Sequence, residues 1–142
     1  MNAVKRIGLD HIKDIAHQLA IATMNWDEPI PAFETRFPKV LESCIATPFQ
    51  TYNRKELYQG HFGKAAILFY LLIKNHPFQN GNKRIAVTTL LIFLLLNKYW
   101  LKIQPAKLYN LAIWVAESDP EVKDAVVAGV ADLVEKYSKK VK

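Results

Sequence analysis

Residues 76–84 read HPFQNGNKR, and this stretch lies between the two most apolar segments of the chain. It brings together a His, two Asn, a Gly and an adjacent Lys-Arg pair. Asn and Gly are weak helix formers, and Pro77 disfavours helix at the residue before it. The pattern therefore predicts that one helix ends near residue 75 and that another begins near Asn82. A polar turn between two apolar helices is a candidate functional site.

The start of the second helix has the features of an anion-binding site. Asn80 occupies the position expected for a helix N-cap, and Gly81 gives the backbone conformational freedom there. The next backbone amides have no acceptor within the helix and carry its positive partial charge. Lys83 adds a point charge, and Arg84 adds a planar fork that suits two phosphate oxygens. We therefore expect this turn to bind a phosphate group.

His76 lies at the end of the preceding helix and faces this turn. An imidazole can accept a proton near neutral pH, so His76 is a candidate base that activates a hydroxyl for attack on phosphorus. The residues leave a plainer alternative open, because Asn-Gly is a common turn dipeptide and a Lys-Arg pair can simply be solvated. Two cations at a helix start oppose the helix dipole, however, and a bound anion would offset that repulsion.

Size and composition predict one globular domain. The chain has 142 residues, 51% hydrophobic and 23% charged, and we expect a single domain 1–142 with a core of about 9–137. A single Cys gives no internal disulfide and no zinc pattern, which favours a reducing, cytoplasmic setting. The N-terminal residues have charges throughout and do not resemble a secretory signal. The longest apolar run, 85–96, is shorter than the roughly 20 residues that a membrane span needs.

Apolar residues recur at helical spacing and strand-like alternation is rare, so we expect an all-α fold. The expected helices cover residues 9–24, 39–46, 62–75, 82–97, 106–116 and about 120–137. Three prolines in 25–38 predict a long loop, and long loops in compact domains are often functional. The polar segment 50–59 is ambiguous.

The C-terminal end of the chain is basic. The formal net charge is +6, and four lysines lie within the last seven residues, at 136, 139, 140 and 142. One interpretation is a solvated, fraying tail, and another is an electrostatic contact for an acidic partner or nucleic acid. Charge alone does not separate these two, so nucleic-acid binding stays a weak alternative.

The motif resembles H-x-F-x-[D/N]-x-N-K-R of the Doc (death-on-curing) toxins, a branch of the Fic superfamily. The segment VLESCIATP at 40–48 is similar to the "LLESALARP" segment of that family, and residues 63–78 and 89–101 resemble its central helices. The resemblance covers about residues 9–137. It implies a helical bundle with the motif in a loop between two central helices.

The resemblance also implies an activity. Most Fic members transfer AMP from ATP to protein hydroxyls, whereas Doc-type members are kinases that pass the γ-phosphate to a threonine of elongation factor Tu and stop translation. Carried over, His76 would be the base, and Asn80 would take the position of the magnesium-binding acid. The phosphate-binding residues would be Gly81, Asn82, Lys83 and Arg84. The candidate contacts with the target protein would be Tyr52, Asn53 and Arg54.

The chain departs from the family pattern at several positions. The metal position usually holds Asp or Glu, and Asn80 offers an oxygen ligand without charge, so weaker Mg²⁺ binding is expected. Lys83 replaces the Gly of AMP-transferring members, and Val87 replaces their second Arg; both changes favour the Doc branch. An AMP-transferring enzyme and a degenerate Fic-fold binding module without catalysis are the alternatives.

The resemblance further implies a partner. The autoinhibitory motif of Fic proteins, [S/T]-x-x-x-E-[G/N], is absent from the sequence. A toxic member would therefore need a separate antitoxin, which could lay a helix or a disordered tail across the site. No membrane partner is expected.

Overall fold

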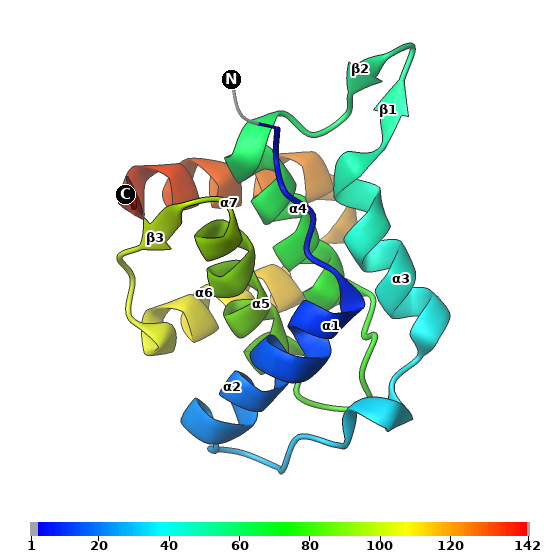
Figure 1. Ribbon diagram of the computed structural model, residues 1–142, viewed down its shortest axis with the longest axis vertical. Helices are drawn as coiled ribbons and strands as arrows, with labels where there is room; N and C mark the ends of the chain where they lie inside the picture. Colours follow the sequence, from blue (N-terminus) through cyan, green and yellow to red (C-terminus); the bar gives the residue numbers. More distant parts are fainter. Residues whose placement is uncertain (1–2, 142) are drawn as a thin grey trace.

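The computed structural model describes residues 3–141, and it is a helical bundle with a few very short strands (Figure 1). The helices are α1 (Leu9–His11), α2 (His17–Thr23), α3 (Pro38–Ala46), α4 (Gly60–Lys74), α5 (Asn82–Leu96), α6 (Pro105–Glu117) and α7 (Lys123–Tyr137). The single-turn elements are η1 (Ile12–Ala16), η2 (Phe33–Thr35), η3 (Thr47–Phe49) and η4 (Pro120–Val122). The predicted all-α class is confirmed. Over residues 3–141, none of the helices combines the length and apolar character needed to cross a membrane.

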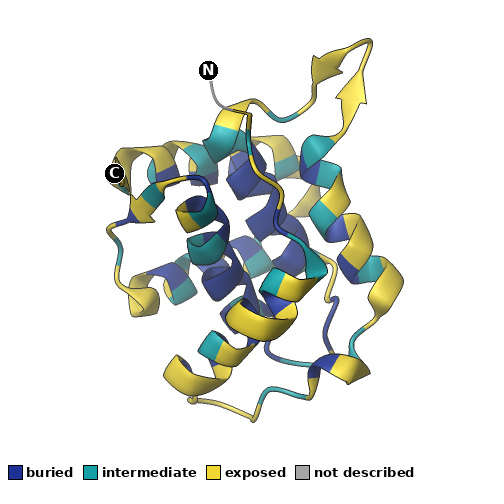
Figure 2. Ribbon diagram, in the orientation of Figure 1, coloured by how far each residue is buried: buried dark blue, intermediate teal, exposed yellow. Residues whose placement is uncertain are grey.

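The two central helices are α4 and α5, and Figure 2 shows them as the most buried part of the bundle. Every residue of α4 from Lys64 to Ile73 is buried, as is every residue of α5 from Arg84 to Leu90. A helix that is apolar on all sides is stable only when other elements surround it. Helices α7 and α3 pack against α4, while α6 and α2 pack against α5. The loop 75–81 between the two central helices is therefore anchored at both ends by the core.

The expected N-terminal helix is present with one irregularity. α1, the π-helical turn η1 and α2 follow one another without a break from Leu9 to Thr23, close to the expected range 9–24. The long loop after α2 extends to Phe37 and contains only the single turn η2. This loop returns to the motif, where the amide of Phe37 donates to the carbonyl of Pro77 at 2.8 Å.

The ambiguous segment 50–59 forms a small hairpin. Strand β1 (Thr51–Tyr52) pairs antiparallel with β2 (Lys55–Glu56), and Asn53 and Arg54 form the turn with φ of 52° and 65°. Two left-handed residues are what a type I′ hairpin turn requires. The buried Lys64 of α4 anchors the base of the hairpin, because it pairs with Glu56 and donates to the carbonyl of Tyr58 at 2.7 Å.

The C-terminal end differs from the expected fraying tail. Strand β4 (Ser138–Lys140) pairs antiparallel with β3 (Tyr99–Leu101), with Trp100 opposite Lys139. The pairing continues beyond the strands, since the amide of Val141 donates to the carbonyl of Lys98 at 2.8 Å. The fraying interpretation is therefore wrong for residues 138–141, because the edge of β3 offers backbone partners that sequence composition does not reveal. Lys142 lies outside the described residues.

Candidate functional site

The motif loop is held by one aromatic side chain. Phe78 is 3% exposed, and its ring centroid lies 6.0 Å from those of His17 and Phe33. His76 has a φ of 51°, a left-handed conformation that non-glycine residues rarely adopt and that costs about 1 kcal/mol or more. Phe78 anchors the loop two residues later, and the His76 side chain is exposed to solvent.

Asn82 is the residue that joins the loop to the helix. Its Oδ1 accepts from the amide of Phe78 at 2.9 Å, and its Nδ2 donates to the carbonyl of Phe78 at 2.8 Å. These two hydrogen bonds determine the orientation of the Asn82 amide. If the amide were rotated by 180°, its Nδ2 would face the amide of Phe78 and its Oδ1 would face the carbonyl of Phe78. Nδ2 also lies 3.4 Å from His76 Nδ1.

That contact brings one ring nitrogen of His76 to the start of α5. Nδ1 lies 3.4 Å from the amino group of Asn82, and it can accept from that group in the tautomer that carries its proton on Nε2. At 3.4 Å the hydrogen bond is long and weak, so an incoming hydroxyl can replace Asn82 at Nδ1 at little cost. Nδ1 is the ring atom that faces Asn82 at the start of α5.

The cap of α5 differs from the expected one by one residue. The N-cap is Gly81, with a φ of 78°, rather than Asn80. A Cβ at Gly81 would lie 2.9 Å from Cγ1 of Ile30, so both conformation and space require glycine here. Asn80 instead accepts from the amide of Gly81 through Oδ1 at 2.8 Å. The predicted N-cap was one residue too early because Asn is more common than Gly at this position.

The first turn of α5 retains unpaired donors. Among residues 3–141, none accepts a hydrogen bond from the backbone amides of Asn82, Lys83 and Arg84. Lys83 is half-buried on the same turn. These groups give the helix end the donors and positive charge of an anion site. Phosphate binding by Gly81, Asn82 and Lys83 stays a prediction that this geometry permits.

Arg84 has a different environment from the one expected. Its side chain is buried, and the guanidinium donates to the carbonyls of Met24 at 3.2 Å, Trp26 at 2.8 Å and Glu28 at 2.8 Å. In this structure its terminal nitrogens are therefore bound to backbone oxygens rather than directed to a phosphate. Lys83 and Arg84 differ in burial because successive helical side chains point about 100° apart, so Arg84 enters the interior while Lys83 stays half-buried.

Asn80 lies beside a carboxylate that the sequence reasoning missed. Its Nδ2 donates to Oε2 of Glu28 at 3.2 Å, and Glu28 belongs to the segment that Arg84 binds. No cluster of three or more His, Cys, Asp or Glu side chains suited to a metal occurs in residues 3–141. Mg²⁺ commonly uses one or two carboxylates together with substrate phosphates and water. The side-chain oxygens of Glu28 and Asn80 are possible ligands of a magnesium ion. They are few, so they fit an ion that binds together with a nucleotide and takes further oxygen ligands from its phosphates.

The predicted target contacts are far from the motif. Tyr52, Asn53 and Arg54 are exposed on the hairpin that precedes α4, whereas His76 follows the other end of that helix (Figure 1). α4 has 15 residues, which corresponds to about 22 Å. The structure does not bring these residues to His76, so a target would have to span that distance to touch both.

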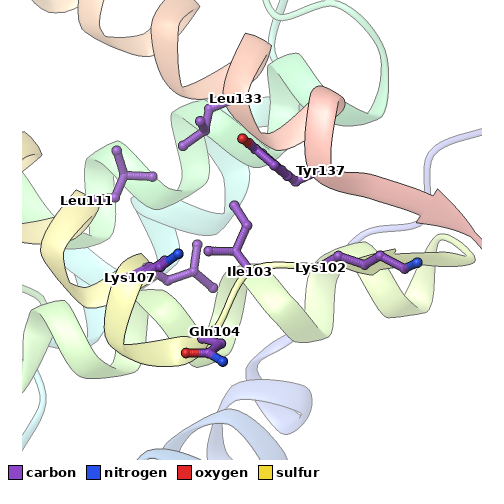
Figure 3. A pocket seen from close by; sticks show the side chains of 8 residues that line it. Lys102, Ile103, Gln104, Lys107, Leu111, Leu133 and Tyr137 are labelled. Atoms are coloured by element: carbon purple, nitrogen blue, oxygen red, sulfur yellow. The ribbon is translucent and has the colours of Figure 1, made fainter.

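Two hollows of the described surface bear on the position of the site. One of about 400 Å³ adjoins the motif and is lined by Lys39, Val40, Ser43 and Asn75. The other, of about 330 Å³, lies between α6, α7 and the chain after β3 (Figure 3). Its lining residues are Lys102, Ile103, Gln104, Lys107, Leu108, Leu111, Leu133 and Tyr137. The residues that line the two hollows do not include any predicted site residue, and the first hollow lies next to the motif through Asn75, the neighbour of His76.

Comparison with known proteins identifies the family of the chain. A sequence profile described as "Fic/DOC family" matches residues 6–94, which is more than half of the chain and includes the whole motif. No curated protein and no solved structure was found to match. The matched region also contains the segment that Arg84 binds. The chain therefore belongs to the Fic/DOC family, a family of nucleotidyl and phosphoryl transferases.

Proposed function

We propose that the protein is a Doc-like toxin of a toxin–antitoxin system, which transfers phosphate from a nucleoside triphosphate to a protein hydroxyl. The supporting observation is that the exposed His76 lies 3.4 Å, through Nδ1, from the side chain of Asn82, whose own backbone amide is one of the unpaired first-turn amides of α5. Following the resemblance, elongation factor Tu in the cytoplasm is the candidate target, and blocked translation is the consequence. A separate antitoxin restrains the activity.

In the proposed reaction, Nδ1 of His76 takes the proton of the target hydroxyl while the hydroxyl oxygen attacks the γ-phosphorus of ATP. The bond from the γ-phosphorus to the bridging oxygen breaks, and ADP leaves with the electron pair. The amides at the start of α5 and the ammonium of Lys83 stabilise the negative charge of the phosphate oxygens. Mg²⁺, held near Glu28 and Asn80, would supply further neutralisation of the phosphates when bound.

Two positions favour phosphate transfer over AMP transfer. Lys83 stands where AMP-transferring members carry Gly, and it brings an ammonium to the turn that binds the phosphates. Val87 stands where they carry a second Arg, and it is 0% exposed, packed within the core. With Arg84 bound to backbone carbonyls, Lys83 is the free cation of this turn. AMP transfer is the second choice.

Labelled ATP tests the proposal. Purified protein is incubated with elongation factor Tu and ATP labelled at the γ- or the α-phosphate. We expect γ-label on the target with the wild type and none with His76→Ala. His61→Ala is the matched control, because His61 packs on Tyr99 at the opposite end of α4 and should not affect transfer. Transfer of α-label instead would identify an AMP transferase.

A binding module without catalysis is the remaining candidate. It is favoured by Asn80 at the metal position and by the engaged guanidinium of Arg84. Calorimetry with ATP in the presence and absence of Mg²⁺ distinguishes it. Binding that is independent of the metal, with no turnover on any target, would support the module and contradict the kinase.

A further inference from the structure

We propose that Glu28 supplies the carboxylate that binds magnesium at the nucleotide site, and that Asn80 orients Glu28 instead of ligating the ion. The inference rests on the proposed function, because the ion would bind together with the phosphates of the nucleotide. It assigns the negative charge that binds the metal to the loop after α2, because residues 76–84 contain no Asp or Glu.

The position of Glu28 is determined by its backbone. Its carbonyl accepts from Nη2 of Arg84 at 2.8 Å, and the preceding Asp27 turns the chain with a φ of 67°. Pro29 follows directly and restricts the backbone of Glu28 to extended conformations. These contacts fix the backbone of Glu28. Its exposed side chain is oriented by the amide of Asn80, whose Nδ2 lies 3.2 Å from Oε2.

Asn80 has the hydrogen-bonding pattern of a positioning residue. Its Oδ1 already accepts from the amide of Gly81 at 2.8 Å, and its Nδ2 faces the carboxylate of Glu28. The amino group, not the oxygen, is thus directed to the place where an acid is found. An amide that donates to a carboxylate can fix its orientation in the way that outer-shell groups fix metal ligands.

The charge of Glu28 is not neutralised within the described chain. Glu28 is exposed and forms no ion pair within residues 3–141, and its side-chain partner is the neutral Asn80. A carboxylate at a helix end that binds a triphosphate would repel the ligand. A divalent cation between the two converts that repulsion into attraction, and Mg²⁺ commonly binds by one carboxylate plus phosphate oxygens.

Titration calorimetry with the ATP analogue that has an imido group between the β- and γ-phosphates tests the inference. The wild type is expected to bind it about tenfold more tightly with Mg²⁺ than with EDTA. In Glu28→Gln the gain from Mg²⁺ should be lost, while binding in EDTA should strengthen because the repulsion is removed. Glu34→Gln is the matched control, since Glu34 is an exposed acid of the same loop. It should behave as the wild type.

Electron paramagnetic resonance of Mn²⁺ gives an independent readout that does not involve turnover. Mn²⁺ should be immobilised on the wild-type protein only when the analogue is present, whereas with Glu28→Gln it should give the signal of the complex that Mn²⁺ forms with the analogue alone. Adding Asn80→Asp to Glu28→Gln should restore immobilisation by returning a carboxylate to the motif.

Two results would overturn the inference, and they can be told apart. If Glu28→Gln keeps the metal dependence of the wild type, Glu28 is not the ligand although nucleotide binding stands. If neither protein binds the analogue under any condition, the proposed function itself fails.

Discussion

Replacing Arg84 separates a structural role from a phosphate-binding role. Its guanidinium donates to the carbonyls of Met24, Trp26 and Glu28, and its side chain is 2% exposed. Arg84→Met keeps most of the apolar stem and removes all three hydrogen bonds. Arg84→Lys keeps the charge, but a single ammonium cannot bind carbonyls spread over five residues as a planar fork does.

The expected loss of stability follows from those bonds. A hydrogen bond from a charged donor contributes about 1.5–3 kcal/mol. Trp26 and Glu28 are exposed, so water can replace the guanidinium at their carbonyls, whereas Met24 is buried. We therefore expect Arg84→Met to lower the free energy of unfolding by about 3 kcal/mol, and Arg84→Lys by about 2 kcal/mol. For a chain of this size, about 3 kcal/mol corresponds to a Tm lower by roughly 10 °C.

Urea denaturation followed by circular dichroism measures the free energy, and a thermal scan measures Tm. Lys83→Met is the control. It removes the neighbouring cation from the same helical turn, and the Lys83 side chain forms no hydrogen bond with residues 3–141. It should change stability by less than about 0.5 kcal/mol. In contrast, it should weaken binding of the ATP analogue, since Lys83 is the cation proposed to face the phosphates.

The opposite pattern would refute this reasoning. If Arg84→Lys unfolds at the wild-type temperature but loses affinity for the nucleotide, then Arg84 leaves the carbonyls and binds phosphate in solution. The structural assignment of Arg84 would then be wrong, and the segment 24–28 would need another anchor.

Three further changes test the site and the core. Gly81→Ala should lower the free energy of unfolding by about 1–2 kcal/mol, because Gly81 has a positive φ and a Cβ there would contact Ile30. Gly129 lies in open space on α7, so Gly129→Ala should raise the free energy of unfolding by about 0.5–1 kcal/mol. Equal effects of the two substitutions in urea denaturation would contradict this. Asn82→Asp places an oxygen against the carbonyl of Phe78, so unfolding free energy should fall by about 2 kcal/mol and transfer should be lost; an active, stable variant would argue against the Asn82 contacts. Burial raises the pKa of the Cys44 thiol from 9.0 to about 11, so the folded state keeps a proton that the unfolded state loses. The stability of the wild type relative to Cys44→Ala should therefore fall by roughly 2 kcal/mol as pH rises through this range, and a constant difference in urea denaturation would contradict it.

The central architecture was predictable from local pattern. The long apolar stretches on either side of HPFQNGNKR had only one favourable location, the interior, and the proline after His76 indicated where the first helix ends. α4 ends at Lys74 and α5 begins at Asn82, within one residue of the expected boundaries. Periodicity and turn chemistry carry this information because both act between neighbouring residues.

The contacts that complete the candidate site were not predictable in the same way. Glu28 meets Asn80 across 52 positions, and Arg84 reaches Met24 across 60. No spacing rule connects residues so far apart, since their meeting depends on how α2 packs on α5. The pairing of Ser138–Lys140 with β3 was missed for the same reason. The density of lysines predicted a solvated tail. Whether these residues form a strand depends on the backbone of β3, which lies about 40 residues earlier in the sequence.

Asn82, Lys83 and Arg84 are consecutive in the sequence, but their side chains have different surroundings. Successive side chains on a helix point about 100° apart, so three neighbours on one turn face three directions. Asn82 binds the motif loop through Phe78, Arg84 binds the loop after α2, and Lys83 lies between them on the same turn, half-buried. One turn of α5 thus binds two loops, the one that carries His76 and the one that carries Glu28. Any substitution that rotates or frays this turn should therefore affect His76 and Glu28 together.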